Sequence, residues 1–311
     1  MRIGVDLGGT KIEAIALDAA GKVLARERVP TPQGKYGATL HAIAALVQKI
    51  EVGVNELGTV GVGTPGALST VTGRLKNSNS VCLNGQAIDV DLSALLQRPI
   101  RVANDANCFA LSEALDGAAT GANVVFGVII GTGTGGGIVV NGQVIEGVNR
   151  ISGEWGHNPL PWPRDDEYPG PLCYCGKRGC IETFISGPAL SAHFQAATGQ
   201  NATALEIAGQ AQRGSRAASV AVEQYVDRFA RALAGVINVL DPDVIVIGGG
   251  LSNMGELYSS VPKLLTRYVF SDAIRTRIVP ALHGDSSGVR GAAWLWGGPH
   301  ANGSRQSEQP A

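Results

Sequence analysis

Charged side chains are scarce in this chain, and neither sign of charge dominates. Lys, Arg, Asp and Glu make up 16% of its 311 residues, and the formal net charge is −1. Nucleic acids and anionic membranes attract basic proteins, so a nearly neutral chain has no electrostatic bias toward either of them. We therefore expect no nucleic acid and no membrane among its partners.

Long apolar runs are also missing, although 44% of the residues are hydrophobic. No run reaches the ~20 residues that a membrane-spanning helix needs. The stretch Met1 to Asp6 reaches an acidic residue too early for the apolar core of a secretory signal. We expect a cytoplasmic protein, long enough for two domains with a substantial core.

Cysteines number only five, and an odd count in a cytoplasmic chain argues against a disulfide framework. Cys82 and Cys108 are isolated and are typical of inert packing residues. Cys173, Cys175 and Cys180 lie close together in the sequence. This cluster indicates a metal site, with three free thiols as the alternative.

Glycine, in contrast, is abundant: the chain has 43, roughly twice the ~7% average. The glycines gather in short runs beside apolar strands. Backbone that must approach a ligand closely is one reason for such runs, and tight hairpins are the other.

Apolar periodicity and turn residues predict an alternating α/β organisation. The expected strands are 2–7, 12–17, 22–29, 59–63, 100–103, 124–130, 138–140, 143–145 and 243–247, and the expected helices are 38–50, 106–119, 215–240, 255–268 and 287–296. The pattern of strand, glycine turn, strand, turn, strand occurs twice, the second time with an Asn141-Gly142 hairpin. This repetition predicts two related α/β halves with a cleft between them. Residues 297–311 are polar and are expected to form a disordered tail.

Two glycine turns can bind phosphate. In Asp6-Leu-Gly-Gly-Thr-Lys11, backbone N–H groups and the Thr10 hydroxyl can face phosphate oxygens, while Asp6 can hold Mg²⁺ through water. The stretch Gly131 to Gly137 has the same potential, and the two together could clamp a triphosphate. A plain hairpin explains either turn alone, and the spacing is not that of a Walker A motif. Gly248 to Gly250 could lie against a nucleobase or simply connect a strand to a helix.

Asn104-Asp105 falls where a strand is expected to end and a helix to begin. A helix N-cap is the plain interpretation of the aspartate. The functional interpretation is a carboxylate at the carboxyl edge of a sheet, where α/β proteins place their sites. There Asp105 could accept a proton from a substrate hydroxyl.

The cysteine cluster has a candidate fourth ligand in His157. Cys173, Cys175 and Cys180 with His157 would form a closed tetrahedral Zn²⁺ set, which indicates a structural metal. The second ring nitrogen of His157 would then be fixed in direction. Glu154 and Glu182 flank this set, so their carboxylates and the imidazole could together hold vicinal sugar hydroxyls, unless each is a solvent-facing surface residue.

These motifs resemble, in content and order, those of the ROK family of repressors, open reading frames and sugar kinases. The resemblance covers roughly residues 1 to 296, and within the family it is closest to bacterial fructokinases of the manno(fructo)kinase type. The closer match is carried by Lys76 to Ser80, Gly153 to Trp162, Glu182 to Gly187 and His283 to Trp296.

The resemblance implies a duplicated actin/hexokinase-like (ribonuclease H-like) fold with two α/β domains flanking a cleft. The expected domains are 1–115, joined by the C-terminal helix 287–296, and 116–286, which holds the zinc-binding loop 157–180. Family members are commonly dimers, so a homodimer is expected.

It also implies roles for single residues. Asp105 would be the catalytic base, and the sugar would be held by Gly66, Asn77, Asn104, Asp105, Glu154, His157 and Glu182. ATP would be held by Gly4, Asp6, Gly8, Gly9, Thr10 and Lys11, by Gly131, Thr132, Gly133, Thr134, Gly135 and Gly136, and by Gly248, Gly249 and Gly250. Zinc would be held by His157, Cys173, Cys175 and Cys180.

The activity expected from the resemblance is ATP- and Mg²⁺-dependent phosphorylation of fructose at O6, with mannose as a possible second substrate. Glucose, N-acetylglucosamine and N-acetylmannosamine are the alternatives within kinases, because the residues around these sugars are nearly shared. A sugar-responsive repressor is the alternative from another class. Family repressors carry a helix-turn-helix before the Asp-x-Gly-Gly-Thr motif, whereas here the motif begins at residue 6.

Overall fold

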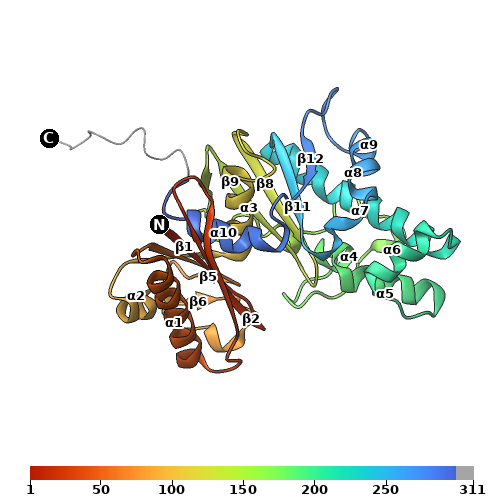
Figure 1. The fold of residues 1–311 in the computed structure, drawn as a ribbon. Helices are drawn as coiled ribbons and strands as arrows, with labels where there is room; N and C mark the ends of the chain where they lie inside the picture. The colour runs from red at the N-terminus through yellow and green to blue at the C-terminus, as the bar shows by residue number, and fades with distance from the viewer. Residues whose placement is uncertain (299–311) are drawn as a thin grey trace. The chain divides into compact units, whose positions relative to one another are not determined.

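The computed structural model describes residues 1–298, which form two compact units (Figure 1). Unit 1 contains Met1–Gly121, Gly142–Ser152 and the segment from Ser286 onward, and unit 2 contains Ala122–Asn141 and Gly153–Asp285. From residue 299 on, the tail that was predicted to be disordered lies outside the described residues.

A five-stranded sheet forms the centre of unit 1, in the order β3-β2-β1-β4-β7. Its strands are β1 (Arg2–Leu7), β2 (Lys11–Leu17), β3 (Val23–Pro30), β4 (Thr59–Thr64) and β7 (Ile100–Asn104). The first three form the predicted antiparallel meander, and β4 and β7 follow in parallel. The carboxyl ends of β1, β4 and β7 therefore meet at one edge of the sheet.

The second sheet repeats this topology in the order β10-β9-β8-β11-β12. Its strands are β8 (Val124–Ile130), β9 (Thr134–Val140), β10 (Gln143–Val144), β11 (Val244–Gly248) and β12 (Arg277–Pro280). Again the first pair is antiparallel, and β11 and β12 are parallel to β8. The predicted duplication of two α/β halves is confirmed by this shared strand order.

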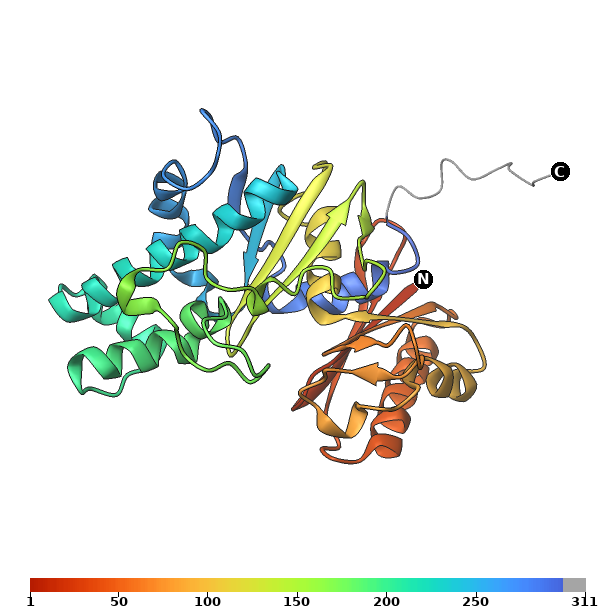
Figure 2. The ribbon, with the colours of Figure 1, turned by 180° about the vertical axis from the view of Figure 1, so that it is seen from behind.

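The helices of unit 1 are α1 (Tyr36–Val54), α2 (Ile88–Leu96), α3 (Asp105–Leu115) and α10 (Ser287–Trp294), with a short hairpin of β5 (Ala67–Leu68) and β6 (Leu75–Lys76). Those of unit 2 are α4 (Glu182–Ile185), α5 (Gly187–Thr198), α6 (Ala204–Gln212), α7 (Arg216–Leu240), α8 (Glu256–Ser259) and α9 (Val261–Leu265). Helices α4, α5 and α6 pack against α7 (Figure 2).

Two expectations about these elements were wrong, and several elements were not predicted. Strand β9 begins at Thr134 rather than 138, because the glycines after it pair in register with β8, so only Gly131 to Gly133 form a loop. The single helix expected at 255–268 is two short helices, since Pro262 in the first turn of α9 cannot continue the hydrogen bonding of α8. Helix α2, helices α4 to α6 and strand β12 were not predicted.

Glycine lets helix α10 lie directly on the sheet of unit 1. A Cβ on Gly4 would lie 2.0 Å from the Val289 carbonyl oxygen, and one on Gly61 would lie 1.9 Å from that of Ala292. These two glycines are register partners on β1 and β4, so the helix crosses both strands at backbone contact. Gly4 was expected in the nucleotide site; the structure instead places it inside β1, buried under α10.

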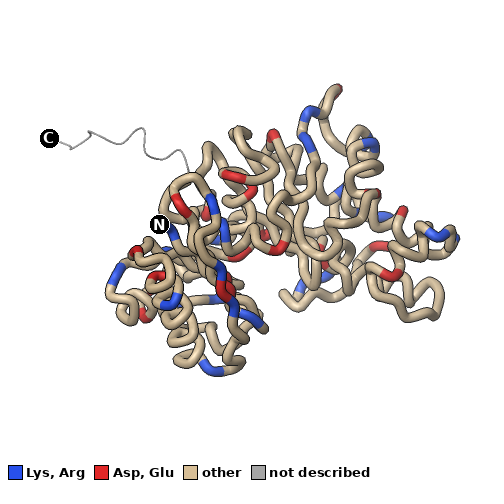
Figure 3. Tube along the Cα trace, in the orientation of Figure 1, with Lys and Arg blue, Asp and Glu red and all other residues tan. Residues whose placement is uncertain are grey.

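The opposite face of the same sheet carries the larger apolar core. Ile3, Val5 and Val62 alternate with the glycines and pack with the buried face of α1. Lys and Arg are interspersed with Asp and Glu in both units (Figure 3). Within residues 1–298, no helix is both long and apolar enough to cross a bilayer.

Candidate functional site

The predicted site residues fall into two groups, one in each unit. In unit 1, the turn between β1 and β2 is closed by the Gly8 N–H, which donates to the Lys11 carbonyl oxygen at 3.0 Å. Gly9 and Thr10 form its exposed tip, while Lys11 already lies in β2. A turn of this shape presents backbone N–H groups and the Thr10 hydroxyl to solvent, as a phosphate site requires.

Asp6 ends β1 beside this turn and is mostly buried. Burial, followed by the charges of Asp105 and Glu13, raises the pKa of Asp6 to about 6 from the usual 3.8. The carboxylates of Asp6 and Asp105 are thus close enough to repel each other. Two acidic groups held together at a strand edge are suited to a hard cation such as Mg²⁺.

Asn104 and Asp105 mark the junction of β7 and α3, as predicted. The Asn104 side chain is the helix cap: its oxygen accepts from the Ala106 N–H at 2.9 Å, and its amide donates to the Gly66 carbonyl oxygen at 3.1 Å. Asp105 is the first residue of α3 and is partly exposed. The Asp105 carboxylate accepts from the same Ala106 N–H at 2.9 Å through Oδ1, in addition to the cap that Asn104 supplies.

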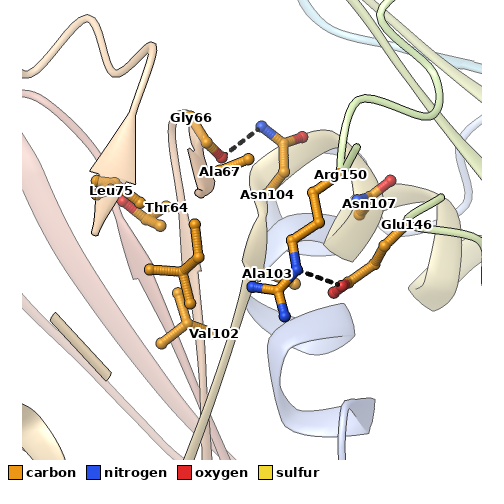
Figure 4. A pocket seen from close by; sticks show the side chains of 11 residues that line it. Thr64, Gly66, Ala67, Leu75, Val102, Ala103, Asn104, Asn107, Glu146 and Arg150 are labelled. Carbon is orange, nitrogen blue, oxygen red and sulfur yellow. Dashed lines mark hydrogen bonds and ion pairs between the residues drawn. The ribbon is translucent and has the colours of Figure 1, made fainter. Parts of the chain in front are cut away.

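A pocket in unit 1 brings several of the expected sugar residues together (Figure 4). Gly66 and Asn104 lie on its wall, and Asn77 is adjacent, since a Cβ on Gly66 would lie 3.1 Å from the Asn77 carbonyl carbon. Asn107, which was not predicted, also lines the pocket. Its side-chain oxygen is buried and has no hydrogen-bond partner among the described residues.

In unit 2, the loop Gly131 to Gly133 connects β8 to β9. The Gly131 carbonyl oxygen accepts from the Gly187 N–H at 2.8 Å, and a Cβ on Gly131 would lie 3.9 Å from the Gly250 nitrogen. The expected phosphate loop and the Gly248 to Gly250 turn therefore lie side by side. Gly249 has a left-handed backbone, with φ of +86°, and a Cβ on it would lie 2.4 Å from the Ile130 oxygen, so no other residue fits there.

The stretch Gly153 to His157 lies along strand β9 through two further glycine contacts. A Cβ on Gly153 would lie 2.3 Å from the Gly136 oxygen, and one on Gly156 would lie 2.2 Å from the Thr134 oxygen. Buried Trp155 donates to the Gly135 oxygen at 3.0 Å. This packing places Glu154 and His157 beside the start of β9.

The expected zinc ligands converge. The ligand atoms of His157, Cys173, Cys175 and Cys180 lie within 4.8 Å of one another. The His157 Nδ1–Cys173 Sγ and Cys175 Sγ–Cys180 Sγ distances are both 3.6 Å. Tetrahedral zinc with bonds of ~2.3 Å to sulfur and ~2.0 Å to nitrogen has edges of roughly 3.5–3.8 Å. The four residues therefore fit a structural zinc ion.

The thiols of the cluster differ in acidity. Burial raises the pKa of the Cys180 thiol to about 12, whereas a backbone hydrogen bond from Lys177 lowers the pKa of Cys175. A buried thiol of this kind ionises only with a positive charge nearby, and a bound metal supplies one. Gly176 and Gly179, both with positive φ, give the chain its tight path between the cysteines.

A buried charge network, not predicted from the sequence, anchors the long segment between His157 and Cys173 to helix α7. Arg231, 1% exposed, makes a two-pronged contact with Glu167 at 2.7 and 2.8 Å. Burial alone would raise the pKa of Glu167, but its hydrogen bonds, first of all to Arg231, lower it to about 2. Arg231 also donates to the Trp162 carbonyl oxygen at 2.8 Å.

Two features near His157 were also not predicted. The second ring nitrogen of His157 lies 2.9 Å from the Tyr174 hydroxyl, so a residue between two zinc cysteines occupies the position expected for a sugar hydroxyl. Burial and then the charge of Glu182 raise the pKa of Tyr174 to about 12. Glu182 itself accepts from the Thr134 N–H at 2.9 Å, which joins it to the glycine loop.

Comparison with known proteins shows the family of this chain. A family profile described as the ROK family matches residues 2–298. The chain belongs to the ROK family. The N-acetyl-D-glucosamine kinase of Salmonella paratyphi A is 41% identical over 299 residues, covering 95% of this chain and 99% of that protein. The ROK hexokinase of Thermus thermophilus superposes with a TM-score of 0.84 at 31% identity, covering 94% and 96% of the two chains.

The ROK glucokinase of Streptomyces griseus, solved with glucose and AMPPNP, superposes with a TM-score of 0.76 at 28% identity over 94% of this chain and 98% of its own. The expected family and the duplicated actin/hexokinase-like fold are thus confirmed. The Salmonella relative is an N-acetyl-D-glucosamine kinase, so the expected fructokinase type is not confirmed.

Replacing Asp6 by Asn is expected to raise the free energy of unfolding by about 1–3 kcal/mol at about pH 8, without nucleotide or metal. The folded-state pKa of about 6 exceeds the ordinary 3.8, so ionisation costs stability as pH rises through 6. At about pH 4 most of this gain should disappear. Urea unfolding at both pH values measures the difference, with exposed Asp272→Asn as control, and equal gains at both values would contradict the electrostatic origin.

The purified protein is expected to carry about one zinc ion per chain. Cys175→Ser should reduce the zinc content to near zero and lower the melting temperature, because one of four ligands is lost. Cys82→Ser, which alters a thiol outside the cluster, is the matched control and should keep its zinc. Elemental analysis with thermal unfolding gives the answer, and a folded wild-type protein without zinc rules the site out.

Proposed function

We propose that the chain is an ATP-dependent hexose kinase whose acceptor is N-acetyl-D-glucosamine, phosphorylated at its 6-hydroxyl. The observation that carries this proposal is the 41% identity, over nearly the whole of both chains, with N-acetyl-D-glucosamine kinases. The residues that such a reaction needs are present at the strand ends of both units. The proposal agrees with the second expectation drawn from the sequence rather than with fructose.

Asp105 is the proposed general base. It lies at the carboxyl end of β7 and the start of α3, where its carboxylate is partly exposed and Asn104 also supplies the helix cap. In the reaction it accepts the proton of the acceptor hydroxyl while the oxygen attacks the γ-phosphorus in line. The transferred phosphoryl group passes to the sugar, ADP leaves, and the proton stays on Asp105 until it exchanges with water.

The glycine turn of each unit is proposed as a phosphate-binding element. Gly8 to Thr10 in unit 1 and Gly131 to Gly133 in unit 2 are partly or fully exposed and can offer backbone N–H groups. Mg²⁺, when bound near Asp6, would neutralise charge on the triphosphate. Because the magnesium needs an ionised carboxylate, the raised pKa of Asp6 should make nucleotide binding weaken below about pH 6.

The zinc set has a positioning role in this proposal. With Nδ1 beside the cysteine sulfurs, His157 is held with Nε2 pointing away from the metal. Glu154 and Glu182 lie in the same part of unit 2, as their shared influence on the pKa of Tyr174 indicates. Two carboxylates and an imidazole would suit sugar hydroxyls if a hydroxyl replaced that of Tyr174 beside Nε2.

Asn107 of unit 1 offers a further polar contact to a bound sugar. Asn107 lines the pocket shared by Gly66 and Asn104, and its buried side-chain oxygen has no partner within residues 1–298. An acetamido N–H is a donor of the kind that this oxygen lacks. A sugar hydroxyl is also a donor, so this contact agrees with the proposal without separating the two sugars.

The first experiment is a coupled ADP-release assay over fructose, mannose, glucose, N-acetylmannosamine and N-acetylglucosamine. N-acetylglucosamine is expected to give the highest kcat/KM, by at least about tenfold, because a site built for a polar group rejects sugars lacking it. Highest turnover with fructose would restore the fructokinase interpretation. No turnover with any hexose in zinc-loaded protein would reject the proposal.

Replacing Asp105 by Asn should lower kcat by about 10²–10⁴-fold, the usual contribution of a positioned base. The shape of the residue is kept, so the melting temperature and the affinity for the sugar should change little. Exposed Asp272→Asn serves as the control for loss of one negative charge. Isothermal titration with the sugar, beside steady-state kinetics, separates binding from turnover, and a near-wild-type kcat would exclude Asp105 as the base.

A further inference from the structure

The carboxylate of Glu182 connects the zinc centre to the glycine loop within unit 2. Glu182 is the first residue of α4 and follows Cys180 by two positions. Its Oε2 accepts the Thr134 N–H at 2.9 Å, at the point where the Gly131 to Gly133 loop enters β9. Thus one carboxylate, expected to hold the sugar, already holds the loop expected to bind phosphate.

Glycine at position 133 is a condition of this contact. A Cβ on Gly133 would lie 2.7 Å from Glu182 Oε2, closer than real Cβ atoms approach an oxygen. Gly131, in the same loop, has only an ordinary contact of 3.9 Å with the Gly250 nitrogen. A Cβ on Gly133 would therefore meet the carboxylate, whereas one on Gly131 would not.

The backbone that carries Glu182 is held on both sides. The Ile181 N–H donates to the Asn158 oxygen at 2.8 Å, and the Thr183 hydroxyl donates to the Cys180 oxygen at 2.7 Å. Ile181 and Phe184 are buried in the core of unit 2. The loop, by comparison, consists of two partly exposed glycines and exposed Thr132. Movement of Glu182 would therefore be passed on to the loop.

The negative charge of Glu182 determines how sugar binding would affect nucleotide binding. With Oε2 on the Thr134 N–H, the second oxygen of Glu182 is the one that a sugar hydroxyl would approach. Without sugar, a negative charge lies against a loop that must receive the anionic phosphates of ATP, which disfavours the nucleotide. A hydroxyl that donates to the carboxylate spreads this charge and reduces the repulsion.

On the basis of the proposed function, we propose that Glu182 is a positioning residue that couples sugar binding to the phosphate loop. Sugar and nucleotide then bind with positive cooperativity, each tightening the other by the same factor. The loop is set for phosphate only when the acceptor is in place. Hydrolysis of ATP without an acceptor is suppressed by the same contact.

The test measures the dissociation constant of Mg²⁺–AMPPNP by calorimetry, with and without saturating N-acetylglucosamine. The wild-type protein is expected to bind the nucleotide analogue roughly 5- to 100-fold more tightly when the sugar is present. Gly133→Ala should bring the ratio of the two dissociation constants close to one. It should also raise the KM for the sugar, even though residue 133 lies in the loop expected to bind phosphate. Gly37→Ala, which adds a methyl group into open space on α1, is the control and should keep a factor near that of the wild type.

Glu182→Gln provides a second variant in case Gly133→Ala does not fold. It keeps an oxygen for the Thr134 N–H but removes the charge, so the analogue should bind more tightly without sugar and the factor should fall. A factor near one in the wild type, or an unchanged factor in both Gly133→Ala and Glu182→Gln, overturns the coupling. If one of these results is found and the wild-type protein still phosphorylates hexoses, the coupling is rejected and the proposed function is kept.

Discussion

Contact between bare backbones is the constraint on which the structure of both units depends. In unit 1, Gly4 and Gly61 let α10 cross two strands without intervening side chains. In unit 2, Gly153 and Gly156 let the chain before His157 lie along β9 in the same way. A methyl group at any of these positions would push apart elements that carry site residues. The high glycine content is thus explained by packing as well as by ligand loops.

The position of the four candidate zinc ligands depends on a second kind of constraint, which is buried charge. A loop that leaves His157 and returns at Cys173 would lose much conformational entropy on being fixed. Arg231 and Glu167 fix it from the side of α7, with their charges paired inside the core. Removing either residue would cost stability, because the other would keep only part of its pairing in the core: Arg231 with Asp227, or Glu167 with Arg228. The ligands of the ion are therefore gathered by the packing of unit 2 itself.

Local patterns predicted the elements whose own residues determine them. The meander of unit 1, helix α7 and the Asn104–Asp105 junction follow from periodicity, turn residues and capping chemistry. What could not be predicted depends on distant partners. Strand β9 takes in Gly135 to Gly137 only because β8 offers a register for them. The bond between Glu182 and Thr134 joins positions 48 residues apart, and no local signal marks it.

The ionised carboxylate of Asp6 lowers the stability of the fold in which it lies. Its carboxylate is buried at a strand end and repelled by Asp105 and Glu13, and each of these effects raises its pKa and favours the neutral acid. A chain selected for stability alone would place an amide there. Arg26 and Arg28 donate to Glu13 at 2.6 and 2.8 Å, and the nearby charge of Lys11 offsets the repulsion at Asp6 only in part. The remaining negative charge is available to a cation, so under the proposed function the cost of burying Asp6 would be a condition of binding Mg²⁺ rather than a defect of the packing.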